Sequence, residues 1–221
     1  MRMPFFSQNR NSFAFALAYS YLRIMANENI ESHPLEPFLP HNAKILMLGS
    51  FPPKRERWSM EFFYPNFNND MWRIIGLLFF GDRSHFVRTD AKRFDREKIA
   101  CFCREKGIAL FDTAAEVRRL KDNASDAFLE IVAPTDIAAL LERIPECRAI
   151  VATGQKAAET LAAGFGCGVP PVGGCANTEF AGRSIAFYRM PSSSRAYPLS
   201  LDRKAEAYGR MFAAEKLLQR N

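Results

Sequence analysis

Short apolar runs bounded by turn residues alternate along this chain with longer segments of helical periodicity. Strands are predicted for four of these runs, at 44–48, 108–111, 149–153 and 184–190. Helices are predicted at about 69–80, 95–106, 134–143, 155–163 and 203–219. Because strands separated by helices favour a parallel sheet with helices on both faces, we expect an α/β fold: a three-layer α/β/α sandwich around a central four-stranded parallel sheet.

The chain has 221 residues, 48% of them hydrophobic, which is enough for one domain with a single core. We expect that domain at 37–221, preceded by an N-terminal extension at 1–36. The extension is either a mobile arm or a mis-assigned start, since Met25 reads as a natural first residue. Its apolar stretch at 13–19 faintly resembles a signal peptide but lacks a clear cleavage site.

No apolar run in the sequence approaches the roughly 18 to 20 residues that a membrane helix needs. We therefore expect no membrane association. We also expect a cytoplasmic monomer with no obligate protein partner, since nothing in the sequence demands an oligomer. The five cysteines form no Cys-x-x-Cys pair and have no histidine at ligand spacing. Inert reduced thiols are the better interpretation, and we expect neither a metal nor a cofactor.

Two loops rich in small residues follow the first and the last predicted strands. They read Gly-Ser-Phe-Pro-Pro at 49–53 and Met-Pro-Ser-Ser-Ser-Arg at 190–195. Open α/β sheets bind ligands at the carboxyl ends of their strands, so the two loops predict a site.

The net charge is +6, and basic residues gather near the first loop and between 83 and 106. Such density suits a polyanion, because each phosphate that a protein neutralises releases condensed counterions. The alternative is a solvated helix face.

Four motifs lie in order along the chain. They are Gly49-Ser50-Phe51-Pro52-Pro53, then Phe62-Phe63-Tyr64 leading to Asn69-Asp70-Met71-Trp72, then Gly107-Ile108-Ala109-Leu110-Phe111-Asp112, and Met190-Pro191-Ser192-Ser193-Ser194. Together they resemble the uracil-DNA glycosylase superfamily, most closely its hypoxanthine-DNA glycosylase branch, over about residues 40 to 215. The resemblance implies a monofunctional DNA glycosylase of base excision repair. Its substrate would be DNA with a flipped deaminated base, hypoxanthine as the preferred interpretation and uracil as the second.

The resemblance assigns catalysis to Asn69, whose carboxamide can orient a water or hydrogen-bond the leaving base. A helix N-cap is the alternative role for this residue. Asn66 or Asn68 are further candidates, because Asn-Phe-Asn replaces the His-Pro-Arg that precedes this asparagine in the family. Phe51 stands where many superfamily members carry a water-activating Asp or Asn, and Met190 where several branches carry a catalytic His or Asn. Either another residue carries the reaction or the protein binds DNA without cutting it.

The resemblance also places the residues that hold the base. Tyr64, with Phe63 as the second choice, fits the aromatic that stacks on the flipped base; the alternative is a core aromatic. Asp112 offers an acceptor for the N1–H of hypoxanthine, whereas adenine has a bare acceptor there; the alternative is an N-cap for a helix near Thr113. The expected base-binding residues are Ser50, Phe51, Tyr64 and Asp112.

A DNA-binding rim is expected around these residues. Small serines allow the backbone to approach phosphates closely, and Lys156 at a helix N-terminus adds a phosphate contact. Arg195, Tyr197 or Leu199 would enter the duplex beside the vacated base. The expected DNA-binding residues are Pro52, Lys156, Ser192, Ser193, Ser194, Arg195 and Tyr197.

Two other functions stay open, because the usual uracil-specific machinery is missing and none of His33, His41 and His85 falls in a motif. One is a non-catalytic DNA-binding member of the same superfamily. The other is an enzyme for small nucleotides or phosphates built on the same sheet. Binding to a duplex without base release would support the first, and preference for free nucleotides the second.

Overall fold

The computed structural model describes residues 30–120 and 128–218. Its central sheet has five strands, in the order β3 (Ile108–Asp112), β2 (Ile45–Gly49), β6 (Ala149–Thr153), β8 (Arg183–Met190) and β7 (Gly174–Phe180). The first four strands run parallel, which confirms the strands predicted from the apolar runs. Every residue of β2, β3 and β6 is buried, as expected for strands covered on both faces.

The sheet differs from the prediction in its fifth strand, because β7 pairs antiparallel with β8 and makes the sheet mixed. The sequence of β7, Gly-Cys-Ala-Asn-Thr-Glu-Phe, alternates between half-buried and exposed positions. It lacks the continuous apolar run that marks the other strands. The four parallel strands were predicted, but the prediction of a purely parallel sheet of four strands is wrong because it lacks this polar edge strand.

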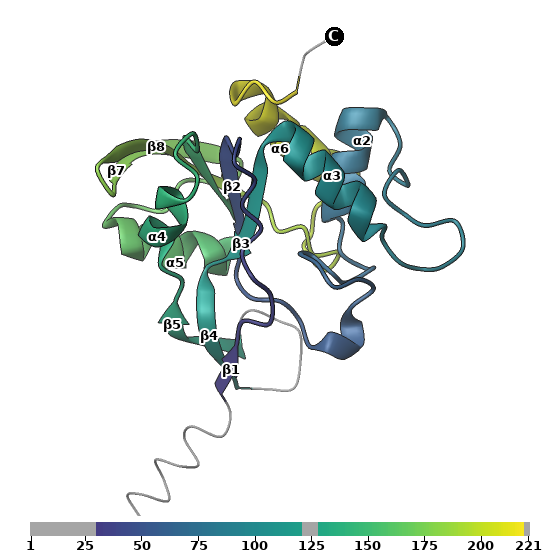
Figure 1. Ribbon diagram of the computed structural model, residues 1–221, viewed down its shortest axis with the longest axis horizontal. Helices are drawn as coiled ribbons and strands as arrows, with labels where there is room; N and C mark the ends of the chain where they lie inside the picture. Colours follow the sequence, from purple (N-terminus) through teal and green to yellow (C-terminus); the bar gives the residue numbers. More distant parts are fainter. Residues whose placement is uncertain (1–29, 121–127, 219–221) are drawn as a thin grey trace, which may run out of the picture.

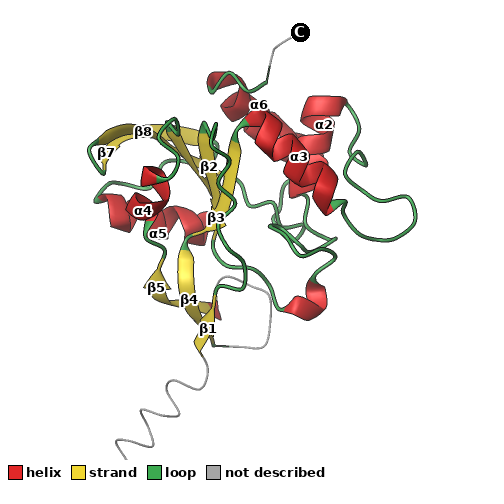
Figure 2. Ribbon diagram, in the orientation of Figure 1, coloured by secondary structure: helices red, strands yellow, loops and turns green. Residues whose placement is uncertain are grey.

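Helices cover both faces of the central sheet (Figures 1 and 2). One face carries α4 (Ile137–Glu142) and α5 (Gln155–Phe165), and the other carries α2 (Met71–Phe80), α3 (Arg96–Lys106) and α6 (Leu201–Ala214). A short 3-10 helix, η1 (Arg55–Arg57), lies in the loop after β2. The three-layer α/β/α fold is thus confirmed. None of the helices within the described residues is long and apolar enough to cross a membrane.

A second, antiparallel sheet adjoins the end of β3. It consists of β1 (Ile30–Ser32), β4 (Ala114–Arg119) and β5 (Leu129–Pro134), with β4 in the middle. Residues 30–36 belong to the expected N-terminal extension, yet β1 pairs with β4. The rest of that extension, residues 1–29, lies outside the described residues. The pairing of β1 brings the following residues of the chain to the carboxyl ends of the central strands.

Candidate functional site

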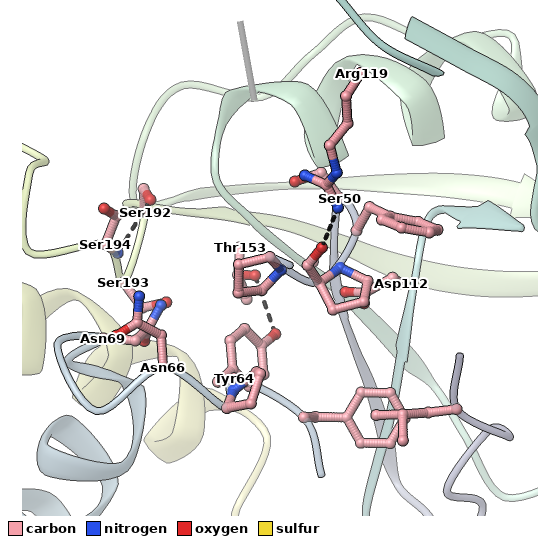
Figure 3. A pocket seen from close by; sticks show the side chains of 17 residues that line it. Ser50, Tyr64, Asn66, Asn69, Asp112, Arg119, Thr153, Ser192, Ser193 and Ser194 are labelled. Atoms are coloured by element: carbon pink, nitrogen blue, oxygen red, sulfur yellow. Dashed lines mark hydrogen bonds between the residues drawn. The ribbon is translucent and has the colours of Figure 1, made fainter. Parts of the chain in front are cut away.

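A cavity of about 150 Å³ opens at the carboxyl ends of the parallel strands (Figure 3). This is where open α/β sheets place ligands. The structure brings together at this cavity nine of the residues singled out in the sequence, namely Ser50, Phe51, Pro52, Tyr64, Asn69, Asp112, Ser192, Ser193 and Ser194. Three others, Lys156, Arg195 and Tyr197, do not line it. Phe63 and Asn66 line it as well, whereas Asn68 does not.

Asp112 ends β3 directly opposite Gly49, the last residue of β2. A Cβ atom at Gly49 would lie 2.4 Å from Asp112 Oδ1, so only glycine leaves space for the carboxylate in this rotamer. The other carboxylate oxygen, Oδ2, lies 3.0 Å from Nε2 of His33. Asp112 is therefore fixed from two sides while it lines the cavity.

His33 is the functional candidate that sequence reasoning missed. Its side chain is only 4% exposed and packs near the rings of Phe51, Phe63 and Phe111. The pairing strand β1 delivers it to the site from 79 positions before Asp112. A contact at that sequence distance has no local motif. A single histidine inside the predicted extension at 1–36, outside every motif, gave no signal that could have identified it.

Tyr64 adopts φ +50, an uncommon conformation for a residue with a side chain. Its hydroxyl lies 3.0 Å from Thr153 Oγ1, at the end of β6, and its ring meets Trp72 edge-on at 6.0 Å. Burial raises the pKa of the Tyr64 phenol well above its ordinary value, and the charge of Asp112 raises it further. Tyr64 is thus a neutral phenol that lines the cavity, and its position is fixed by Thr153 at the hydroxyl and by Trp72 at the ring.

Asn69 lies at the start of α2, opposite Ser194 in a short antiparallel bridge. Its Oδ1 accepts the backbone N–H of Met71 at 2.9 Å. The N-cap of α2 is Asp70 and not Asn69, so the bond to Met71 is an Asx turn that supports the start of the helix from one position before the cap. Because the carbonyl oxygen is engaged, the Nδ2 amide group is the part of Asn69 that can serve the cavity as a donor.

A buried ion pair fixes the serine loop after β8 to the start of α2. Lys204 of α6 is fully buried and its Nζ lies 2.9 Å from Asp70 Oδ2. The same ammonium donates to the carbonyl of Ser194 at 2.7 Å, and the backbone N–H of Asp70 donates to the carbonyl of Ser193. These contacts join three elements behind the cavity and set the distance between Asn69 and the serines.

Arg119 of β4 holds the first loop from the other side. Its guanidinium donates to the Pro52 carbonyl at 2.7 Å and forms an ion pair with Glu31 of β1. It also lies over the ring of Phe51 at 5.6 Å. The small antiparallel sheet thereby supports both the loop after β2 and Asp112.

Known proteins that are similar to this chain in sequence or in fold carry the names of DNA glycosylases. No family model matches the chain. A hypoxanthine DNA glycosylase from Methanosarcina acetivorans is 28% identical over 121 residues, which is 55% of this chain and 70% of that protein. A solution NMR structure of a provisionally assigned uracil DNA glycosylase from the same organism matches with a TM-score of 0.56, at 22% identity, over 85% of this chain and 99% of that one. The chain therefore has the α/β fold of that structure and is similar in sequence to that hypoxanthine DNA glycosylase over about half of its length.

Phe51 lines the cavity with an apolar side chain. It is 9% exposed and packs in a cluster with Ala114, Val117 and Leu129 of the small sheet. A phenyl ring here can close the cavity but can neither donate nor accept a hydrogen bond. Polar chemistry at this site must come from other residues that line the cavity.

The described residues hold no group of histidines, cysteines and carboxylates arranged for a metal ion. All five cysteines are free thiols, and Cys103 and Cys147 are buried. Burial raises the pKa of the Cys147 thiol to about 11. This thiol stays protonated near neutral pH, which suits a packing role better than a nucleophile.

Proposed function

We propose that the chain is a monofunctional DNA glycosylase of base excision repair. It hydrolyses the N-glycosidic bond of a deaminated base flipped out of DNA, with hypoxanthine as the preferred base and uracil as the second. The observation that carries the proposal is the Asp112 carboxylate fixed beside a cavity at the carboxyl ends of the sheet. The similarity to a protein named hypoxanthine DNA glycosylase supports the same base.

Asp112 explains the choice of base. An ionised carboxylate only accepts hydrogen bonds. Hypoxanthine presents N1–H to such an acceptor, whereas adenine presents a bare ring nitrogen whose lone pair would face the carboxylate. The unmodified base would leave a buried polar group unpaired, which costs about 1–3 kcal/mol. Ser50 and Phe51 close the cavity around the same base.

Tyr64 stacks on the flipped base in this proposal. Extruding a base from the duplex costs a few kcal/mol. Stacking on an aromatic ring returns roughly 1–3 kcal/mol. The contacts of Tyr64 with Thr153 and Trp72 hold its ring in place before DNA arrives, so little ordering cost remains on binding.

Asn69 acts on the bond itself. A water oxygen bonds to C1′ of the sugar while the bond to the base breaks, and the electron pair of that bond leaves with the base. The water proton passes to solvent. With Oδ1 engaged by Met71, the Nδ2 group of Asn69 donates a hydrogen bond to the base as it gains negative charge.

The DNA strands are held by the loops that border the cavity. Pro52 and the serines at 192–194 have little side-chain bulk, so the backbone can approach phosphates. Arg195, with its side chain 53% exposed, and Tyr197 follow these serines, and in this proposal they would enter the duplex beside the vacated base. Lys156 lies in the first turn of α5, where the helix N-terminus also favours a phosphate.

A second candidate function is a superfamily member that binds DNA without cleaving it. Phe51 is the specific observation that favours it, because this side chain cannot activate a water. In that case the cavity would bind a flipped base and release nothing.

Base release from labelled duplexes that contain one hypoxanthine, uracil or xanthine tests the proposal. Alkali cleavage at abasic sites is the readout. We expect release from the hypoxanthine duplex, and we expect Asn69→Ala to lower its rate by about 100-fold or more while DNA binding is retained. Asn68→Ala is the matched control for the rate of base release, because Asn68 does not line the cavity. Its DNA binding is measured separately, since Asn68 Oδ1 accepts a hydrogen bond from Arg195.

Each result decides between the candidates. Tight binding to the duplexes without release of a base from any of them would support the non-catalytic function instead. Unchanged excision by Asn69→Ala would remove this residue from catalysis, and Asn66→Ala would then be the variant to measure, since Asn66 also lines the cavity.

A further inference from the structure

We propose that His33 is a positioning residue that keeps Asp112 as a hydrogen-bond acceptor and thereby selects bases with an N–H beside a ring carbonyl. This inference rests on the proposed function and adds the group that sets its selectivity. It begins from the 3.0 Å contact between His33 Nε2 and Asp112 Oδ2.

The backbone of Leu35 fixes the orientation of the His33 ring. The Leu35 carbonyl lies 2.8 Å from Nδ1 and the Leu35 N–H lies 3.2 Å from the same atom. A doubly protonated ring donates to the Leu35 carbonyl from Nδ1 and to Asp112 from Nε2. A neutral ring donates to a charged Asp112 only in the tautomer with the proton on Nε2, in which Nδ1 accepts the Leu35 N–H. In the proposed role Nε2 is the protonated atom, and the tautomer with the proton on Nδ1 alone would contradict it.

The His33 donor faces a carboxylate that is largely withdrawn from solvent. The Asp112 side chain is 10% exposed, and the His33 ring that contacts it packs near Phe51, Phe63 and Phe111. A hydrogen bond donated to a charged carboxylate in such a place is among the stronger ones, and it favours the acceptor-only form of Asp112. A protonated Asp112 would gain an O–H donor and would then bind the bare ring nitrogen of adenine as well.

The selected class follows from the chemistry of deamination. Loss of the exocyclic amine turns a bare ring nitrogen into an N–H beside a carbonyl, both from adenine to hypoxanthine and from cytosine to uracil. One acceptor-only group can therefore recognise both products and reject both parent bases. In this chain His33 maintains that group in its acceptor-only form.

Substitutions at His33 test the proposal by separating ring packing from hydrogen bonding. His33→Phe keeps an aromatic ring and removes the donor, whereas His33→Gln replaces the donor with an amide N–H. The measurement is affinity for duplexes with one 2′-fluoro hypoxanthine or 2′-fluoro adenine nucleotide, which resist cleavage, together with single-turnover release from the ordinary hypoxanthine duplex.

We expect His33→Phe to reduce the preference for hypoxanthine over adenine by about 10- to 100-fold, the range for a hydrogen bond to a charged group. His33→Gln should recover most of that preference. In an Asp112→Asn background, His33→Phe should have no further effect on it. A preference within about twofold of the unsubstituted protein in His33→Phe would overturn the proposal, as would an equal loss of affinity for both duplexes without rescue by His33→Gln.

Nitrogen-15 spectra of the histidine rings in the unsubstituted protein keep the proposal testable if His33→Phe fails to fold. Nε2 of His33 should be protonated at neutral pH and above, and an unprotonated Nε2 would overturn the assignment. A failure of the proposed function gives a different result. The unsubstituted protein would then release no base from any duplex, while the spectra and the 2′-fluoro binding comparison would still report on His33.

Discussion

Gly49 has no space for a side chain on the face where β2 meets β3. The Cβ of an alanine would approach Asp112 Oδ1 to 2.4 Å, so Asp112 would have to leave its rotamer and its contact with His33. We expect Gly49→Ala to destabilise the protein by about 1–3 kcal/mol, as overpacked substitutions do, and to lower base release together with stability. Urea unfolding and the base-release assay measure the two effects.

Gly164→Ala is the matched control for that substitution. Gly164 lies inside α5, and a Cβ there meets nothing within 4 Å. We expect it to stabilise the protein by up to about 1 kcal/mol, because alanine costs less backbone entropy than glycine in a helix. Equal effects of the two alanines would contradict the steric role of Gly49.

At the scale of single residues, the sequence predicted those site residues that follow an apolar run or lie in a motif. Asp112, Tyr64 and Asn69 all line one cavity. Their roles in catalysis and base binding stay predictions. His33 and Lys204 could not be found in this way, because each acts through a partner far away in sequence and neither lies in a pattern of its own.

Lys204 is a buried cation through which helix α6 contacts both Asp70 and the serine loop. Lys204→Met would leave the Asp70 carboxylate without its buried partner and would free the Ser194 carbonyl. Removing one member of a buried pair costs about 3–5 kcal/mol, so we expect a loss of this size in the free energy of unfolding. Urea unfolding monitored by circular dichroism gives the value.

Arg203→Met on the same helix provides the comparison. Arg203 pairs with Glu206 at the surface, with side chains 72% and 53% exposed. Exposed pairs contribute roughly 0–1 kcal/mol, so this variant should unfold almost as the unsubstituted protein does. If Lys204→Met were as mild as Arg203→Met, the buried pair would not be what fixes the serine loop to α2.

Some helices and strands can be predicted from the residues within them, whereas others depend on the strands with which they pair. Buried parallel strands such as β2 and β6 can be predicted because each is a continuous apolar run. The helices can be predicted from their periodicity and their capping residues. The strands β1, β4, β5 and β7 carry charged or small residues and are stabilised by pairing. Among these four strands, only β1 pairs with a distant segment, and such pairing leaves no trace in the order of polar and apolar positions. β7 is joined to β8 by a two-residue turn at Ala181 and Gly182, so its polar sequence, and not its distance, explains why it was missed.

For the whole molecule, buried tyrosines link stability to alkaline pH. Burial raises the pKa of Tyr64 and Tyr208 above the ordinary value of 10.0. Above about pH 10 the unfolded chain loses these two protons while the native protein keeps them. The free energy of unfolding should therefore fall by about 1.4 kcal/mol per pH unit for each tyrosine as the pH rises further.

Urea unfolding of the unsubstituted protein and of Tyr64→Phe, at intervals from about pH 8 to pH 11, measures this slope. In Tyr64→Phe, the fall in the free energy of unfolding per pH unit should be smaller by the contribution of one tyrosine. The same slope in both proteins above about pH 10 would mean that Tyr64 is ionisable in the native state.

The small sheet of β1, β4 and β5 has its own apolar cluster, yet Arg119 of β4 lines the cavity and His33, which follows β1, contacts Asp112. Both side chains reach the site through residues of the central sheet and its first loop, Asp112 and Pro52. In the proposed function the small sheet is therefore a tuning module. Substitutions in it would change the choice of base by moving residues that it does not itself contain.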